Sequence, residues 1–137
     1  MSSADLLARW NACGYYRLVG MTVDHADAGS SELRITIRDE HLQAYGSAHG
    51  GIVAGLIDAA MGLAVLGGIP ADEGCATIQM TTNFTAPAMP GPLTAIGRTL
   101  HPGRRIVVAS AEARNAEGRL VAVGQGTFQR FPLEESA

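Results

Sequence analysis

A single carboxylate interrupts the longest apolar stretch of the chain. Between Gly50 and Ala71 the only ionisable residue is Asp58, and the side chains beside it are apolar. A carboxylate within an apolar helix is costly to bury unless it is paired or used chemically. Asp58 also lies too far from either end of the segment to cap a helix. The pattern makes Asp58 the first candidate for chemistry, with a side chain that simply faces solvent as the alternative.

His49-Gly50-Gly51 stands where this apolar segment begins. The first amides of a helix have no intrahelical acceptor, and the helix dipole favours negative charge beside them. Glycine lets a ligand oxygen come close to the backbone, so the pattern is typical of an oxyanion hole. Two plainer interpretations remain, because glycines also open helices for steric reasons and His49 could serve only as a helix-entry residue.

Helix geometry keeps these two candidates apart. Gly50 and Asp58 are eight residues apart, so a straight helix separates them by about 12 Å. Asp58 cannot reach an oxygen bound at its own Gly50 amide. If the two residues act together, Asp58 must come from a second chain whose helix runs antiparallel alongside. Gly51, Gly55 and Ala59 would permit such an approach, or they fit the helix against its own sheet. The sequence therefore links activity to a homodimer.

The elements that must position these residues follow from the hydrophobic pattern and its turn signals. We expect helices over 3–12 and 50–66, and strands over 18–26, around 33–38, and over 76–86, 93–101, 104–114 and 119–130, with a polar loop over 39–48. This order favours an α+β fold with an antiparallel sheet over a doubly wound α/β fold. Because the long helix is apolar on all sides, the sheet must wrap it or a partner chain must cover its far side.

The composition excludes several functions. The chain has 137 residues, ten basic residues that are all arginine, and no lysine, which excludes Schiff-base chemistry and a Walker A loop. A net charge of −3 gives no case for nucleic-acid binding. The glycines and the carboxylate of the apolar segment argue against a membrane span. Without a secretory signal we expect a cytoplasmic protein of one domain, 1–137, with a helical segment over 1–17.

Cysteine and histidine add no further site. Cys13 and Cys75 are isolated, without metal-ligand spacing, and we expect both to be reduced. No cluster of histidine, cysteine and acid has the spacing of a zinc site, so no metal is predicted.

Several short motifs occur in a fixed order along residues 18–130. They are Gln43, His49-Gly50-Gly51, the run from Leu56 to Gly62, the run from Thr77 to Phe84 with Ala86-Pro87 and Pro90-Gly91, the run from His101 to Arg105, the run from Glu117 to Ala122, and Gly126-Thr127-Phe128. Their order and spacing resemble the hotdog-fold acyl-CoA thioesterases of the PaaI type. The resemblance implies an antiparallel sheet wrapped around a long central helix, with active sites at a dimer interface and a homotetramer built from two dimers.

The resemblance also implies a role for each matched position. The family's catalytic carboxylate, nucleophile or general base, falls on Asp58, and the amide that polarises the thioester carbonyl falls on Gly50. His49 and Gln43 would orient the thioester or a water molecule, and Thr77 would supply a hydroxyl near the reacting centre. A glutamine together with an aspartate mixes two pairings of the family, so direct attack and water activation both remain open.

The last matched positions concern coenzyme A. His101, Gly103, Arg104 and Arg105 fall where the family contacts its phosphates, although two arginines in a turn are also typical of a solvated surface. Coenzyme A is part of the substrate, so no separate cofactor is implied. The implied activity is hydrolysis of an acyl- or aroyl-CoA. The alternatives are a hotdog hydratase or dehydratase, whose histidine signature is missing here, and a non-catalytic acyl-CoA-binding protein, which the acid at position 58 disfavours.

Overall fold

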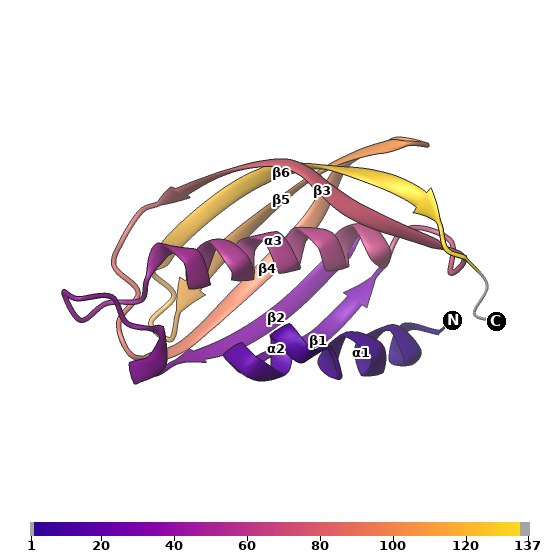
Figure 1. The fold of residues 1–137 in the computed structure, drawn as a ribbon. Helices are drawn as coiled ribbons and strands as arrows, with labels where there is room; N and C mark the ends of the chain where they lie inside the picture. Colours follow the sequence, from indigo (N-terminus) through magenta and orange to yellow (C-terminus); the bar gives the residue numbers. More distant parts are fainter. Residues whose placement is uncertain (1, 135–137) are drawn as a thin grey trace.

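A computed structural model describes residues 2–134, in which a six-stranded sheet curls around one long helix (Figure 1). The helices are α1 (Ser3–Asn11), α2 (Gly14–Val19) and α3 (Gly50–Leu66), with a 3₁₀ turn η1 (Asp39–His41). The strands are β1 (Met21–Asp27), β2 (Ser30–Ile37), β3 (Glu73–Phe84), β4 (Gly91–Pro102), β5 (Ile106–Asn115) and β6 (Leu120–Pro132). Their spatial order is β1-β2-β4-β5-β6-β3, and every neighbouring pair is antiparallel. The predicted α+β fold with an antiparallel sheet around a central helix is confirmed.

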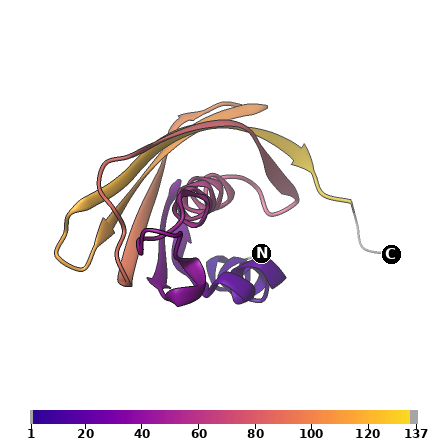
Figure 2. The ribbon, with the colours of Figure 1, turned by 60° about the vertical axis from the view of Figure 1, so that its left-hand side comes forward.

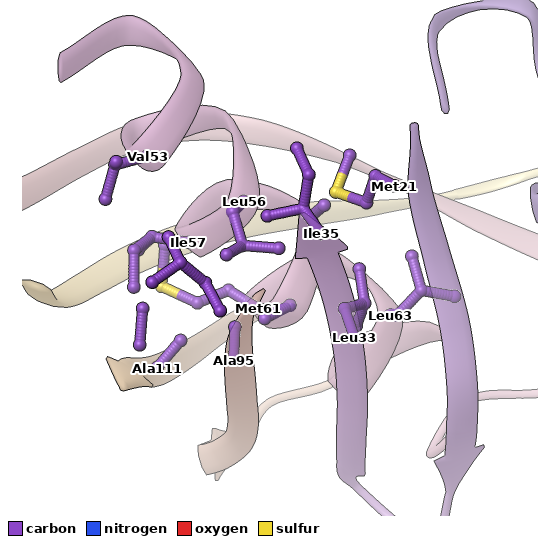
Figure 3. Packing of buried hydrophobic residues seen from close by; sticks show 14 of the residues in the cluster. Met21, Leu33, Ile35, Val53, Leu56, Ile57, Met61, Leu63, Ala95 and Ala111 are labelled. Atoms are coloured by element: carbon purple, nitrogen blue, oxygen red, sulfur yellow. The ribbon is translucent and has the colours of Figure 1, made fainter. Parts of the chain in front are cut away.

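The concave face of the sheet buries most of α3. Figure 2 shows the sheet arching over α3, with α1 and α2 beside the end formed by β1. Ile57 and Met61 of α3 are fully buried in the core (Figure 3). Ala95 of β4 and Ala111 of β5, which belong to the same core, leave room for these larger side chains. Most of the apolar surface of α3 is thus buried within one chain.

Helix and sheet come into close contact where β4 passes α3. A Cβ atom on Gly97 would lie 2.1 Å from the Ala60 carbonyl oxygen. The Ser31 hydroxyl of β2 donates a hydrogen bond of 2.5 Å to that same oxygen. A side chain at position 97 would therefore push α3 away from the sheet and break this hydrogen bond.

One face of α3 is left open by the sheet. Gly51, Gly55, Asp58 and Gly62 follow one another at helical spacing, and each is exposed or half-buried. Of the small residues expected to form one seam, Gly51 and Gly55 lie on this open face, whereas Ala59 is buried in the core. Within the described chain, α2 reaches the open face through a tyrosine and β3 borders it, so Asp58 remains accessible.

The first helix starts at a well-defined cap. Ser2 is the N-cap of α1. The Ser2 hydroxyl accepts a hydrogen bond of 3.1 Å from the Asp5 amide, and the Asp5 carboxylate accepts one of 3.0 Å from the Ser2 amide. This reciprocal pair is a capping box, which satisfies two otherwise free amides.

The strand prediction from residue 18 was wrong at its start. Residues 14–19 form α2, which ends at Gly20 in the left-handed conformation with φ of +79°, and β1 begins only at Met21. The four strands after α3 lie close to their predicted positions. None of the helices within residues 2–134 is long and apolar enough to cross a membrane.

Candidate active site

Asp58 and Thr77 meet on the open face of α3. The Thr77 hydroxyl donates a hydrogen bond of 2.7 Å to Asp58 Oδ1. Thr77 comes from β3, which carries an irregularity in its pairing with β6 between Thr77 and Gln79. One carboxylate oxygen is therefore oriented by a neutral donor, while Oδ2 has no partner within residues 2–134 and stays available for chemistry.

Two titratable side chains, the buried Tyr16 and the half-buried Cys75, carry pKa shifts to which the charge of Asp58 contributes. Burial raises the pKa of the free thiol of Cys75 to about 11, and the negative charge of Asp58 adds to this shift. Burial also raises the pKa of the Tyr16 phenol, with smaller contributions from Cys13 and Asp58. Both groups stay protonated near neutral pH. Neither of them competes with Asp58 as an anionic nucleophile.

The N-terminus of α3 carries a free backbone donor. His49 is the N-cap, and its Nδ1 accepts a hydrogen bond of 2.8 Å from the Gly51 amide. In the neutral ring this places the proton on Nε2. The Gly50 amide has no acceptor within residues 2–134. A Cβ atom on Gly50 would meet the Phe84 ring at 3.4 Å, so this amide lies beside an aromatic side chain at the positive end of the helix.

A cavity of about 430 Å³ adjoins this amide. Gln43, Gly50, Val53 and Phe84 are among its lining residues, and Asp58 is not. Gln43 is held within its own loop, because Nε2 donates a hydrogen bond of 2.7 Å to the Ser47 hydroxyl and Oε1 accepts one from the Tyr45 amide. The structure thus groups Gln43 with Gly50 at one end of α3, and Asp58 with Thr77 at its middle.

The residues expected to contact coenzyme A lie at the turn between β4 and β5. His101, Arg104 and Arg105 are exposed, and Gly103 is half-buried. Pro102 of β4 and Val107 of β5 are the last paired residues before this turn. One strand, β6, lies between β5 and β3, the strand that carries Thr77. Within one chain these side chains share no hydrogen bond with the Asp58 pair.

Arg130 of β6 is hydrogen-bonded to the turn between β4 and β5. Its guanidinium forms two hydrogen bonds with the Glu73 carboxylate, of 2.6 and 2.9 Å, and lowers the pKa of that carboxyl group. The same side chain donates a hydrogen bond of 3.1 Å to the Gly103 carbonyl, and the Arg130 amide donates one of 2.8 Å to the Arg105 carbonyl. A single arginine therefore links β3, β6 and the turn.

Sequence reasoning missed three residues around this site: Tyr15, Cys75 and Arg130. A Cβ atom on Gly55 would lie 2.6 Å from the Tyr15 hydroxyl, one turn before Asp58. A signal for Cys75 was its position two residues before Thr77, because alternate residues of a strand share a face. Within residues 2–134, no group of histidine, cysteine and acidic side chains could hold a metal ion.

An antiparallel sheet wrapped around one central helix, with chemistry-bearing residues along that helix, defines the hotdog class of enzymes. A family model described as the thioesterase superfamily matches residues 45–122. That range includes Gly50, Asp58 and Thr77. The chain belongs to the thioesterase superfamily, and the predicted assignment to the hotdog-fold thioesterases is confirmed, with the PaaI protein sharing the fold.

Known proteins agree with this assignment over most of the chain. A relative from Halobacterium salinarum, named "Putative esterase", is 36% identical over 129 residues, which cover 86% of this chain and 85% of the relative. The PaaI protein from the phenylacetic acid degradation operon of E. coli superimposes with a TM-score of 0.86 at 23% identity, covering 96% of this chain and 94% of that one. A Staphylococcus aureus protein gives a TM-score of 0.82 at 25% identity, with 87% and 99% covered.

Proposed function

We propose that the protein is an acyl-CoA thioesterase that hydrolyses an acyl- or aroyl-CoA to the free acid and coenzyme A. The observation that carries the proposal is the Asp58 carboxylate, oriented by the Thr77 hydroxyl at 2.7 Å on the open face of α3. A carboxylate suffices for this reaction, because a thioester is an activated acyl group and its thiolate is a good leaving group.

The Gly50 amide supplies the second part of the mechanism. Its N–H donates to the thioester carbonyl oxygen, and the positive end of α3 stabilises the negative charge that develops there. Asp58 Oδ2 then attacks the carbonyl carbon, or removes a proton from a water molecule that does so. In either route the C–S bond breaks and coenzyme A leaves as the thiolate. After direct attack, a water molecule hydrolyses the acyl–Asp58 anhydride to release the free acid and restore the carboxylate; in the water route the acid forms at once, and the proton on Asp58 passes to the thiolate or to solvent. Gln43 and His49, which surround the Gly50 amide, hold the thioester or the water.

These two parts must come from different chains. The helix runs unbroken from Gly50 to Leu66, so about 12 Å separates Gly50 from Asp58 of the same chain. An antiparallel second α3 would bring each Asp58 to the partner's Gly50 and form two equivalent sites. Gly51 and Gly55 support this arrangement because α3 itself presents no side chain at these two positions of its open face, where the neighbouring bulky group is Tyr15 of α2. We extend the proposal to a homotetramer built from two such dimers.

The proposal also assigns the turn between β4 and β5. His101, Gly103, Arg104 and Arg105 contact the phosphates of coenzyme A. The exposure of both guanidinium groups supports this role, because arginine forms bidentate contacts with phosphate.

A spacing in a related enzyme supports the pairing of Gln43 with Asp58. The Staphylococcus aureus protein, called a thioesterase, has been solved with alanine in place of a glutamine and, separately, of a glutamate. Those two positions are fifteen residues apart, as Gln43 and Asp58 are here.

Replacement of the carboxylate tests the proposal directly. Asp58→Asn keeps the size of the side chain but removes its charge, and we expect turnover to fall on the order of 100-fold or more. Thiol release from a panel of acyl-CoAs measures the loss, with circular dichroism and chromatography to show that fold and assembly are kept. Asp39→Asn, the same chemical change on an exposed turn, is the matched control. Near-full activity of the Asp58 variant would refute the mechanism.

A further inference from the structure

The ion pair of Arg130 and Glu73 is the least exposed of those within residues 2–134. Its side chains are 16% and 26% exposed, whereas in every other pair both side chains are at least 33% exposed. Arg130 donates from Nε at 2.6 Å and from Nη2 at 2.9 Å, one hydrogen bond to each carboxylate oxygen. This parallel arrangement fixes the plane of the guanidinium group, which a single contact would leave free to rotate. Glu73 therefore sets the direction in which the third nitrogen of Arg130 points.

The third nitrogen, Nη1, points to the turn between β4 and β5. It donates a hydrogen bond of 3.1 Å to the Gly103 carbonyl, and the Arg130 amide donates one of 2.8 Å to the Arg105 carbonyl. These two acceptors stand on either side of Arg104 in the chain. The turn lies at the end of the sheet where β3 begins and β6 ends (Figure 1). One residue of β6 thus holds the backbone of the turn both before and after Arg104.

The turn depends on these hydrogen bonds because side chains do not fill the space beside it. A cavity of about 360 Å³ lies there, and Pro102, Val107 and Arg130 are among its lining residues. The backbone is closely folded, since a Cβ atom on Gly103 would clash with the Ile106 carbonyl oxygen. The two arginines of the turn are exposed, and within residues 2–134 their guanidinium groups form no ion pair. Their position is therefore set by the backbone that carries them.

We propose that Arg130 is a positioning residue for coenzyme A, which holds the turn in the conformation in which Arg104 and Arg105 contact the phosphates. The inference rests on the proposed thioesterase function, in which this turn binds coenzyme A. It adds Arg130 and Glu73 as residues that act through the turn and touch neither the phosphates nor the reacting atoms. The guanidinium group lowers the pKa of the Glu73 carboxyl group, so the pair stays ionised at neutral pH.

A plainer role of the pair is to join the ends of β3 and β6. Glu73 is the first residue of β3, and Arg130 lies opposite Cys75 in the register of the two strands. Loss of this link would loosen the sheet and affect all substrates alike. Loss of the hold on the turn would affect only substrates that carry the phosphates. The two roles can therefore be separated by the choice of substrate.

Arg130→Lys makes this separation. Lysine keeps the positive charge, but its single ammonium group cannot form both contacts with Glu73 and also reach the Gly103 carbonyl. For the acyl-CoA that the wild-type protein hydrolyses best, we expect kcat/KM to fall roughly tenfold, through a higher KM at unchanged kcat. The pantetheine thioester of the same acyl group carries no phosphate and should react as before. An equal fall with both substrates, or no fall with either, would overturn the inference.

Arg114→Lys is the matched control. Arg114 of β5 also joins a carboxylate to a turn, because it donates hydrogen bonds of 2.9 Å to Glu112 and of 3.0 Å to the Gly118 carbonyl. It lies at the opposite end of the hairpin formed by β5 and β6. Hydrolysis of both thioesters should be unchanged in this variant, and thermal unfolding shows that both lysine variants are folded. The same selective fall in the control would reveal a general effect of arginine replacement and overturn the inference.

A further combination shows whether Arg130 acts through the arginines of the turn. In a protein with Arg104→Ala and Arg105→Ala, kcat/KM for the acyl-CoA is already reduced, and adding Arg130→Lys should reduce it no further. Residues that act as one unit are not additive, because the second loss removes nothing that remains. Effects that multiply would show that Arg130 acts independently of the turn, and would overturn the inference.

Binding of free coenzyme A, measured by calorimetry, distinguishes a failure of this inference from a failure of the proposed activity. If the wild-type protein hydrolyses no acyl-CoA but binds coenzyme A more tightly than Arg130→Lys does, the thioesterase proposal is refuted and the role of Arg130 is supported. Hydrolysis of acyl-CoA with equal binding by the two proteins would support the thioesterase and overturn the role of Arg130. Absence of both hydrolysis and binding would refute both.

Discussion

Asp58 influences its neighbours through charge, and Cys75 reports that influence. The thiol has a pKa of about 11, mainly because it is buried and secondly because Asp58 is negative. Asp58→Asn removes the negative charge near Cys75. Without that charge the thiolate is more stable, so the pKa of Cys75 falls. We expect faster alkylation of Cys75 at about pH 9 in this variant, while the reaction stays slower than that of a free thiol with an ordinary pKa near 8.5.

The alkylation is measured by mass spectrometry in a Cys13→Ser background, over a range of pH. Asp39→Asn, on an exposed turn, should leave the rate unchanged. An unchanged rate in the Asp58 variant would show that the carboxylate does not act on the thiol, and would contradict the contact between β3 and α3 described above.

At the residue scale, the sequence supplied the candidates but not all of their neighbours. Asp58 and Gly50 stood out because of a charge in an apolar helix and a glycine at a helix start. Thr77 was matched only through the family resemblance. Cys75 and Tyr15 could not be connected to Asp58, because their contacts depend on which strand and which short helix border the open face of α3.

At the scale of elements, the contact between β4 and α3 leads to a stability prediction. Gly97→Ala places a methyl group where the Ala60 carbonyl lies, 2.1 Å away. Because backbone and not a flexible side chain must yield, we expect a loss of about 3 kcal/mol in the free energy of unfolding. Urea denaturation followed by circular dichroism measures it. Gly14→Ala is the matched control, since nothing lies within 4 Å of its added methyl group. Equal stability of the two variants would disprove the close contact.

How well the sequence predicted each helix or strand depended on its length and on the residues that begin and end it. The helix over 50–66 was predicted with its observed bounds, because a long apolar run is followed by Gly67-Gly68 and Pro70. The helical segment expected over 1–17 was not divided into α1 and α2, and the following strand was begun too early, because α2 has only six residues and no side-chain cap. In β3, Ile78 and Phe84 are 55% and 54% exposed, although both are apolar. β3 lies at the edge of the sheet, and strand order is not visible in one sequence.

At the scale of the whole molecule, the described chain holds the parts of a site without joining them. The Gly50 amide and the Asp58 carboxylate lie on one straight helix, and their separation is fixed by its geometry. Gly50→Pro removes the amide donor without costing an internal hydrogen bond, since that amide has no acceptor within residues 2–134. Proline is tolerated at the first position of a helix, and the extended ψ of 138° at His49 suits a residue before proline.

Mixing the two defective chains tests whether the site is shared. Homodimers of Asp58→Asn and of Gly50→Pro should both be inactive, but a mixed dimer would contain one intact site, with Gly50 from one chain and Asp58 from the other. Random pairing of equal amounts should restore about a quarter of the original activity. Thiol release after joint refolding measures it, and each variant refolded alone is the control. If each site lay within one chain, the mixture would remain as inactive as its components.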